Sequence, residues 1–178
     1  MPADFAQRTA EFASLGADRL TASPGSPSST AASKVDVMED GVAALAKELG
    51  ETKFVSLVTY KRDGTPVGAA MWIASDGDDL VAWTPADAWK VKRVRRDPRI
   101  VVIRSSRMGK VDPVEPELLG TAIVEESPTA VAKAEQLIRR KYGAQFHIIT
   151  TIEAILARGR KPRVALRITP QQVNSKSG

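Results

Sequence analysis

The sequence of 178 residues contains no cysteine and a single histidine, His147. Without cysteine the chain can form no disulfide, has no thiolate nucleophile and lacks the ligands of most zinc sites. A single histidine removes most of the remaining metal sites. We therefore expect no bound metal, and the composition suits a reducing cytoplasm.

Long apolar runs and a large excess of one charge are also missing. No stretch reaches the roughly 18 apolar residues that a membrane-spanning helix needs. Asp4, Glu11 and Asp18 lie where a secretion signal would have a basic start and an apolar middle. We therefore expect a cytoplasmic protein without a membrane partner. The 26 lysines and arginines against 21 aspartates and glutamates favour an anionic partner, but more weakly than in an obligate nucleic-acid binder.

Composition divides the chain into two tails and one folded domain. Residues 21–34 are almost wholly small residues, serine, threonine and proline, which bury too little apolar surface to offset the entropy of ordering. We predict a disordered or weakly helical tail over residues 1–34, one domain over residues 35–172 and a short tail over residues 173–178. The 43% apolar composition is sufficient for a globular core.

The hydrophobic pattern of the domain changes between helix and strand. Apolar residues at helical spacing predict a helix over residues 35–50 and favour one over residues 146–159. Ser127 and Pro128 predict the start of another helix, which Gly143 ends. Six strands are predicted, over residues 53–61, 66–75, 80–84, 99–106, 118–126 and 162–169.

Short turns between the strands indicate the fold class. Asp63 and Gly64 form the first turn, and the second covers residues 76–79, a cluster that lacks the further oxygen ligands of a calcium loop. Tight hairpins join antiparallel strands and do not build parallel β-α-β units. We therefore expect a mainly β fold, a six-stranded antiparallel barrel with helical insertions.

Positive charge is concentrated in residues 83–100, WTPADAWKVKRVRRDPRI. We predict that Thr84 ends a strand and that, with Pro85 and Asp87, it starts a helix that ends before Pro98. A helix N-terminus offers unpaired backbone N–H groups and the positive end of the helix dipole. This local pattern predicts an anion-binding site at the start of the basic helix.

The side chains of this helix extend that prediction. Thr84, the unpaired N–H groups and Lys90 would form a cradle for a phosphate, with Arg93 on the same face of the helix. A basic helix surface is, however, more often solvent-exposed than a ligand site. The spacing alone leaves both interpretations open.

Four further motifs occur in the same order as in a known family: TYKRDGTPV, MWIASDGDDLVAWTPADAWKVKRVRRDPRI, the GTA of LLGTAIV, and RRKYG. Over about residues 37–170 the chain resembles the flavin- and deazaflavin-binding split β-barrel family related to pyridoxamine 5′-phosphate oxidase. Within that family, these motifs resemble the actinobacterial branch classed as probable enzymes dependent on coenzyme F420. The resemblance implies a homodimeric split β-barrel whose cofactor lies in a groove between the two barrels.

The resemblance also implies which residues bind the cofactor. Its phosphate end would be held by Thr84, Ala88, Lys90 and Arg93, and its ring would be lined by Thr59, Met71 and Trp72. Ordinary core packing would suit Trp72 and Trp83 equally well. Trp89 departs from the family pattern, which has a small residue or an arginine there, and would either cover the groove or crowd the cofactor tail.

Other residues near this site carry weaker signals. A basic rim of Lys92, Arg95, Arg96, Arg107 and Lys110 would attract the oligoglutamate tail of a deazaflavin. No catalytic residue is identified, because hydride transfer by a cofactor requires position and desolvation from the protein, not an acid–base pair. His147 is expected to be structural or a surface group, ahead of a proton donor. Tyr142 is expected to pack against the barrel, with a hydrogen bond to cofactor or substrate as the alternative. Residues 105–117 and 143–160 are expected to determine acceptor specificity.

The leading hypothesis is a cytoplasmic homodimeric oxidoreductase. It would transfer a hydride from reduced coenzyme F420 to an unsaturated or quinone-like small organic acceptor, with FMN as the alternative cofactor. A second hypothesis is a non-catalytic carrier of a flavin, haem or another planar ligand. A nucleic-acid-binding barrel ranks last, because the basic residues of the helix interleave with valines and not with exposed aromatic residues.

Overall fold

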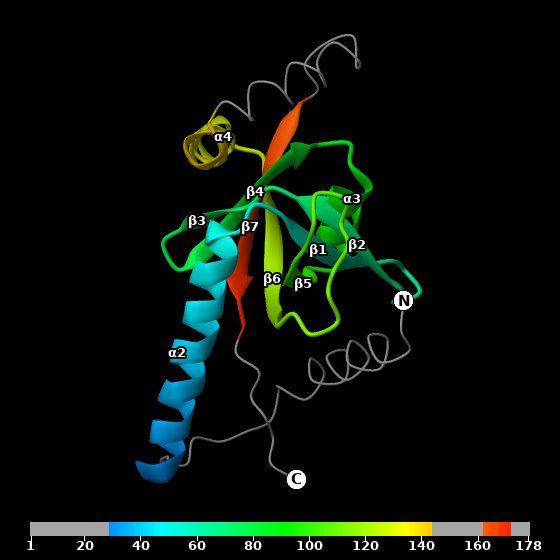
Figure 1. Ribbon diagram of the computed structural model, residues 1–178. Helices are drawn as coiled ribbons and strands as arrows, with labels where there is room; N and C mark the ends of the chain where they lie inside the picture. Colours follow the sequence, from blue (N-terminus) through cyan, green and yellow to red (C-terminus); the bar gives the residue numbers. More distant parts are fainter. Residues whose placement is uncertain (1–28, 144–161, 172–178) are drawn as a thin grey trace.

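The computed structural model describes residues 29–143 and 162–171, which form one curled antiparallel sheet and three helices (Figure 1). The strands are β1 (Val55–Tyr60), β2 (Pro66–Met71), β3 (Ala74–Asp76), β4 (Asp79–Pro85), β5 (Arg99–Arg104), β6 (Glu117–Glu125) and β7 (Arg163–Pro170). The helices are α2 (Ser29–Glu51), α3 (Trp89–Arg96) and α4 (Pro128–Tyr142). The expected antiparallel split-barrel fold is confirmed.

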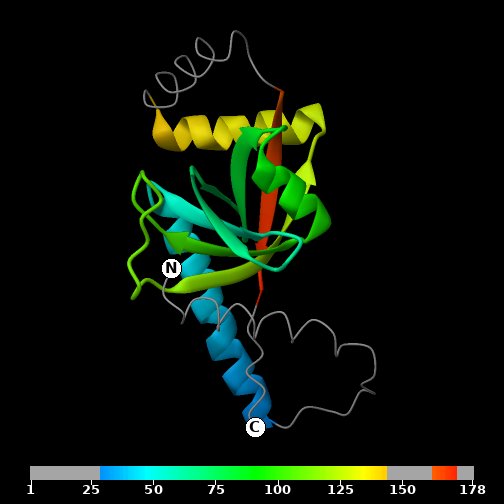
Figure 2. The same ribbon diagram turned by 90° about the vertical axis from the view of Figure 1, so that its right-hand side faces the viewer.

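The seven strands follow the order β2-β1-β5-β6-β7-β4-β3. Every neighbouring pair is antiparallel, and the sheet curls around a core, as the crossing of its strands in Figure 2 shows. The hairpin between β1 and β2 has the predicted turn, in which Gly64 has a φ of 78° and Asp63 accepts a hydrogen bond from the Thr65 N–H at 2.9 Å. The curled sheet therefore begins with the hairpin that its sequence predicts.

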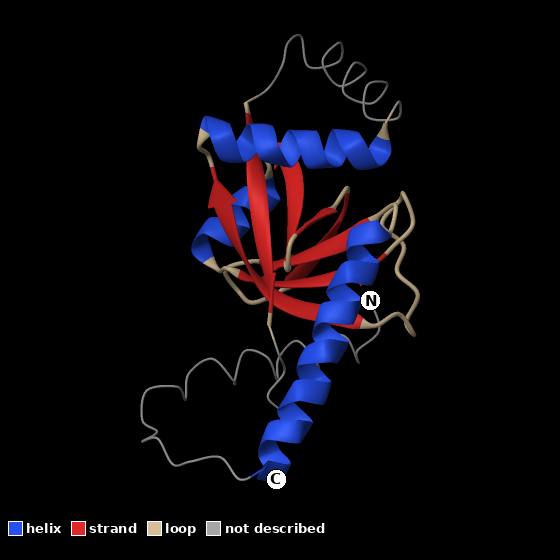
Figure 3. Cartoon of the chain, turned by 90° about the vertical axis from the view of Figure 1, so that its left-hand side faces the viewer, coloured by secondary structure: helices blue, strands red, loops and turns tan. Residues whose placement is uncertain are grey.

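Buried apolar side chains form three clusters, and the alternating residues of β4 contribute to two of them. On β4, Leu80 and Ala82 point into the barrel core, whereas Val81 and Trp83 belong to a second cluster with α4. Figure 3 shows α4 lying across one end of the strands, while α2 runs along the outside of the sheet. Leu49, near the end of α2, is 1% exposed and closes the core. The two faces of β4 thus connect the barrel interior with the α4 layer.

Three predictions differ from the structure by more than one or two residues at the end of an element. Residues 66–75 form two strands, β2 and β3, because the chain leaves the strand conformation at Trp72 and Ile73, so the sheet has seven strands and the expected six was wrong. The helix predicted from residue 35 begins at Ser29. The helix predicted to follow Thr84 begins only at Trp89.

The late start of α3 has a clear cause. Thr84 and Pro85 continue β4 and pair with Val164 and Arg163 of β7, so the strand ladder extends through both residues. Proline is accepted at a strand end, where its missing N–H breaks no ladder hydrogen bond. The residue that precedes α3 is Ala88, which makes no side-chain capping hydrogen bond. The predicted capping box of Thr84, Pro85 and Asp87 is therefore wrong.

The start and end of α4 agree with the prediction. The Ser127 side chain accepts a hydrogen bond from the Ala130 N–H at 3.2 Å, Pro128 is in the first turn, and Gly143 ends the helix with a φ of 53°.

None of the helices within residues 29–143 and 162–171 is long and apolar enough to cross a membrane. His147, the predicted helix over residues 146–159, and most of both predicted tails lie outside the described residues.

Candidate functional site

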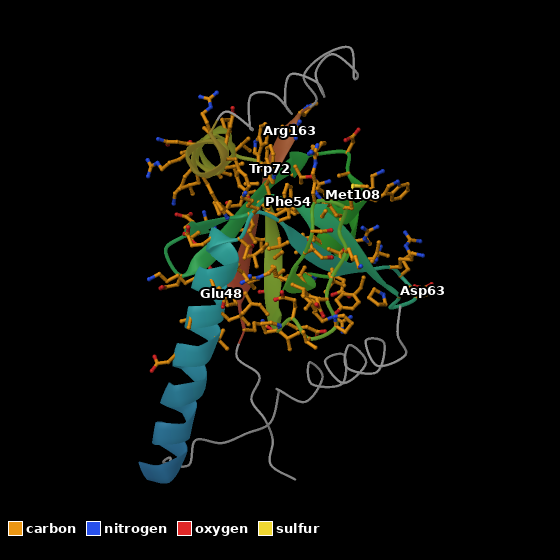
Figure 4. The ribbon with its side chains drawn as sticks, in the orientation of Figure 1. Glu48, Phe54, Asp63, Trp72, Met108 and Arg163 are labelled. Atoms are coloured by element: carbon orange, nitrogen blue, oxygen red, sulfur yellow. The ribbon has the colours of Figure 1, made fainter. Side chains whose placement is uncertain are left out.

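A groove of about 320 Å³ opens where β2, β4, β7 and α3 meet. Its lining residues are Phe54, Ala70, Met71, Trp72, Trp83, Thr84, Pro85, Lys90, Arg107 and Arg163. In Figure 4, Arg163, Trp72 and Phe54 follow one another from top to bottom through the middle of the molecule. The volume lies at the small end of the range for ligand pockets, about 300–1,000 Å³.

The groove combines positive charge with aromatic surface. Lys90 from α3, Arg107 from the loop after β5 and Arg163 from β7 all line it, and no acidic residue is among the lining residues that the structure describes. The guanidinium carbon of Arg163 lies 4.3 Å from the centre of the Trp83 ring, which is a cation–π contact. Such a groove would attract an anionic ligand that also carries a flat apolar group.

Four of the seven predicted site residues line the groove: Met71, Trp72, Thr84 and Lys90. Met71 ends β2 and Trp72 follows it, Thr84 lies at the end of β4, and Lys90 lies in the first turn of α3. Thr84 is 2% exposed, on the same face of β4 as the core residue Ala82. It therefore presents little surface to a ligand, even though it borders the groove.

The other three predicted residues, Thr59, Ala88 and Arg93, are not among the lining residues. The Arg93 Nε donates a hydrogen bond to the Thr59 Oγ1 at 2.7 Å, and Thr59 is fully buried on β1. Ala88 packs against the barrel core from the turn before α3. The structure thus brings Arg93 and Thr59 together as an internal contact that attaches α3 to β1.

Several lining residues were not predicted as cofactor ligands. Phe54 precedes β1 and Arg163 begins β7, and neither carries a local signal. Only the pairing of β4 with β7 brings Arg163 beside Trp83. Arg107 was expected on the basic rim and instead lines the groove itself. Trp89, the unusual residue of the basic segment, is 72% exposed, and Lys92 lies over its ring at 4.5 Å. The role predicted for Trp89 at the groove stays a prediction.

Two side chains at the end of α4 contact the backbone next to the groove. The Tyr142 hydroxyl accepts a hydrogen bond from the Ile73 N–H at 3.2 Å and donates one to the Lys53 carbonyl at 2.8 Å. The Lys141 ammonium donates to the Ile73 carbonyl at 2.7 Å and to the Gly50 carbonyl. Tyr142 is therefore structural, as expected.

Within the described part of the chain, no group of acidic or histidine side chains is placed to bind a metal.

Lys141 should make the stability of the protein depend on pH. Burial lowers the pKa of Lys141 from its ordinary 10.5 to about 8, and burial raises the pKa of Tyr142 from 10.0 to about 12. Between pH 8 and 10.5 the unfolded chain keeps the Lys141 proton that the native state has released, so the free energy of unfolding rises with pH. From pH 10 to 12 Tyr142 has the opposite effect, because it ionises first in the unfolded chain.

We therefore expect these two groups to increase stability from about pH 8 to about pH 10 and to decrease it above that pH. Urea unfolding at a series of pH values checks this, because the midpoint and slope give the free energy of unfolding at each pH. The variant Lys141→Met should lose the increase. An increase of the same slope in the variant would assign the effect to another group.

Comparison with known proteins agrees with this fold. The family model for pyridoxamine 5′-phosphate oxidase matches residues 42–177. A comparison with curated protein sequences finds no significant match.

Three solved structures illustrate the likeness. The conserved hypothetical protein Rv2991 of Mycobacterium tuberculosis is 22% identical, with 73% of this chain and 80% of that chain covered and a TM-score of 0.54. HutZ, the heme storage protein of Vibrio cholerae, is 13% identical over 74% of this chain and 91% of that chain, with a TM-score of 0.52. A heme binding protein of Mycobacterium smegmatis is 17% identical over 73% of this chain and 51% of that chain, with a TM-score of 0.51.

At these identities the likeness to solved structures concerns the fold alone. The family match covers most of the chain, from α2 through β7, and so includes every strand of the curled sheet. The chain therefore belongs to the pyridoxamine 5′-phosphate oxidase family.

Proposed function

We propose that the groove binds a flavin-type cofactor and that the protein is a cytoplasmic oxidoreductase. Coenzyme F420 is the proposed cofactor and FMN the alternative. The acceptor of the hydride would be an unsaturated or quinone-like small organic molecule. The observation that carries the proposal is that three positively charged side chains and several aromatic side chains line one groove, in a chain of this family.

The lining residues fit the two ends of such a cofactor. Lys90, Arg107 and Arg163 would hold its phosphate by charge and hydrogen bonds, which guanidinium groups form in pairs with phosphate oxygens. Met71 and Trp72 would lie against its ring and exclude water. When bound, the cofactor supplies the carbon that carries the hydride, so the chain itself has to bind, orient and desolvate.

We also propose that the protein is a homodimer and that the second copy covers the open side of the groove. The support is the resemblance of the sequence motifs to a family of homodimers, together with a groove at the small end of the ligand-pocket range. Light scattering coupled to size-exclusion chromatography gives the mass of the species in solution. A monomer at all concentrations would contradict this part of the proposal.

Fluorescence titration of the purified protein with coenzyme F420, and separately with FMN, tests the cofactor. We expect micromolar or tighter binding of the deazaflavin, weakened about tenfold in Lys90→Ala, which corresponds to about 1.4 kcal/mol. The comparison variant is Lys92→Ala on the same helix, for which we expect a clearly smaller loss, because Lys92 lies over Trp89 and is not among the lining residues. Equal losses in both variants would contradict a specific role for Lys90.

The titration also separates the alternatives. If the protein prefers FMN, the proposed site is unchanged and FMN is the cofactor in place of coenzyme F420. Binding of the cofactor without oxidation by any acceptor would favour a carrier. Because two structural relatives are named for heme, a heme titration belongs in the same series. If the folded protein binds neither coenzyme F420 nor FMN, the proposal is wrong.

A further inference from the structure

We propose that Tyr142 and Lys141, at the end of α4, are positioning residues for the groove. They would hold the backbone that carries its apolar wall, although neither of them lines it. The proposal rests on the proposed function, because its consequence is the affinity for the ligand.

The first step concerns the break between β2 and β3. Ile73 is fully buried and lies outside both strands, and no backbone–backbone hydrogen bond of its N–H or carbonyl is found in the described part of the chain. Buried backbone polar groups need partners. Here two adjacent side chains of α4 provide both: the Tyr142 hydroxyl for the N–H and the Lys141 ammonium for the carbonyl. The conformation of the break therefore depends on the end of α4.

The second step concerns the residues on either side of these contacts. Met71 and Trp72 immediately precede Ile73, and both line the groove. The same Tyr142 hydroxyl also donates a hydrogen bond to the Lys53 carbonyl at 2.8 Å. The residue after Lys53, Phe54, lines the groove as well. One hydroxyl thus connects the two chain segments that form the apolar wall.

The third step concerns the ring of Tyr142. It stacks on Trp72 with a centroid distance of 4.8 Å and an angle of 20° between the planes. Tyr142 is 8% exposed and packs in the cluster that contains Ile138 of α4 and Val81 of β4. The indole of Trp72 therefore has the ligand groove beside it and a buried ring of α4 against its face. Its orientation is set before any ligand arrives.

These contacts have a consequence for binding. Ordering a mobile wall when the ligand binds costs free energy and lowers the affinity. A wall that is already rigid avoids this cost. Residues that support a site in this way affect its affinity without touching the ligand. Loss of the Tyr142 hydroxyl should loosen both wall segments together.

The variant Tyr142→Phe tests this, because it keeps the stacked ring and removes only the hydroxyl. We expect its affinity for coenzyme F420, or for FMN if the wild type binds FMN, to be about tenfold weaker. Hydrogen–deuterium exchange of the ligand-free protein should become faster in peptides that contain Ile73 and Phe54. Lys141→Met should have the same effect on the peptide with Ile73.

Two controls separate positioning from general destabilisation. Tyr60 is 3% exposed, and its hydroxyl has no hydrogen-bond partner in the part of the chain that the structure describes. Tyr60→Phe is therefore the matched control substitution, because it removes a buried hydroxyl that makes no hydrogen bond. Ile138→Val removes one buried methyl group from α4. It should lower the free energy of unfolding by about as much as Tyr142→Phe does. Both controls should keep the affinity of the wild type and its slow exchange at Ile73.

The outcomes distinguish this proposal from the proposed function. If the wild type binds neither cofactor, the proposed function fails and the exchange rates at Ile73 and Phe54 alone decide whether Tyr142 holds the wall. Unchanged affinity in Tyr142→Phe for a ligand that the wild type binds overturns the positioning role. Equal effects of Tyr142→Phe and Ile138→Val on affinity or on exchange also overturn it.

Discussion

Gly120→Ala is expected to lower the free energy of unfolding by about 2–3 kcal/mol, one of the largest effects of a single methyl group in this protein. Gly120 lies in β6 between Ile100 of β5 and Pro170 of β7. A Cβ atom at this position would lie 2.6 Å from the Thr169 carbonyl oxygen. That oxygen belongs to the backbone of a paired strand, so it can move only if the ladder between β6 and β7 distorts.

Chemical or thermal unfolding measures this effect, and for a chain of this size the expected loss corresponds to about 5–10 °C in the midpoint temperature. The matched control is Gly41→Ala in the exposed part of α2, where an added Cβ meets nothing within 4 Å. Alanine is the better helix former, so this variant should gain about 0.5–1 kcal/mol. Wild-type stability in Gly120→Ala would contradict the close approach of β6 and β7.

Arg167→Met is expected to lower the free energy of unfolding by about 2 kcal/mol at neutral pH. From β7 the Arg167 guanidinium contacts Glu125 at 3.1 Å, Asp76 at 3.0 Å and Asp79 at 3.4 Å. These three carboxylates come from β6, the end of β3 and the start of β4, and each is no more than about a quarter exposed. Removing the guanidinium would leave them close together with much less compensating charge.

The effect of Arg167→Met should depend on pH. Hydrogen bonds from Lys133 and then Arg167 hold the pKa of Asp76 below its ordinary 3.8. A lowered carboxyl pKa stabilises the native state above the pKa of the unfolded chain, and this contribution is lost as pH falls through the native value. The difference between wild type and variant should therefore be largest near neutral pH and should shrink below about pH 4.

Urea unfolding at neutral and at acid pH measures both parts of this prediction. Arg95→Met is the control, because Arg95 pairs with Glu126 on the surface, where both side chains are about half exposed. An exposed pair contributes only about 0–1 kcal/mol. If Arg167→Met costs no more than Arg95→Met, the cluster around Arg167 does not connect β3, β4, β6 and β7 energetically.

Both expected effects concern the sheet that holds the groove in shape. The pairing of β4 with β7 brings Trp83 beside Arg163, and the Arg167 cluster lies further along the same two strands. Gly120 permits the close contact of β6 with β7, on the other side of β7. The groove is therefore formed by strand ends whose positions depend on long-range pairing. A change in that pairing is expected to alter ligand binding as well as stability.

Local residue patterns were sufficient for the fold class and for several boundaries. The Asp63-Gly64 turn, the start of α4 at Ser127 and Pro128 and its end at Gly143 are where the sequence predicts them. Each depends on the backbone preferences and short-range hydrogen bonds of neighbouring residues, which a single sequence contains. The local pattern also selected Thr84 and Lys90, and the family resemblance selected Met71 and Trp72. The structure places all four around one groove.

Other features depend on residues far apart in the chain, and only the tertiary structure decided them. The strand conformation of Thr84 and Pro85 follows from pairing with β7, the Arg93 side chain bonds Thr59 across 34 positions, and Ile73 bonds Tyr142 across 69. A proline after a threonine suits both a helix start and a strand end, so local propensity could not distinguish them. Arg163 and Phe54 reach the groove for the same reason, because the closure of the sheet, and not the neighbouring residues, sets where the strand ends lie.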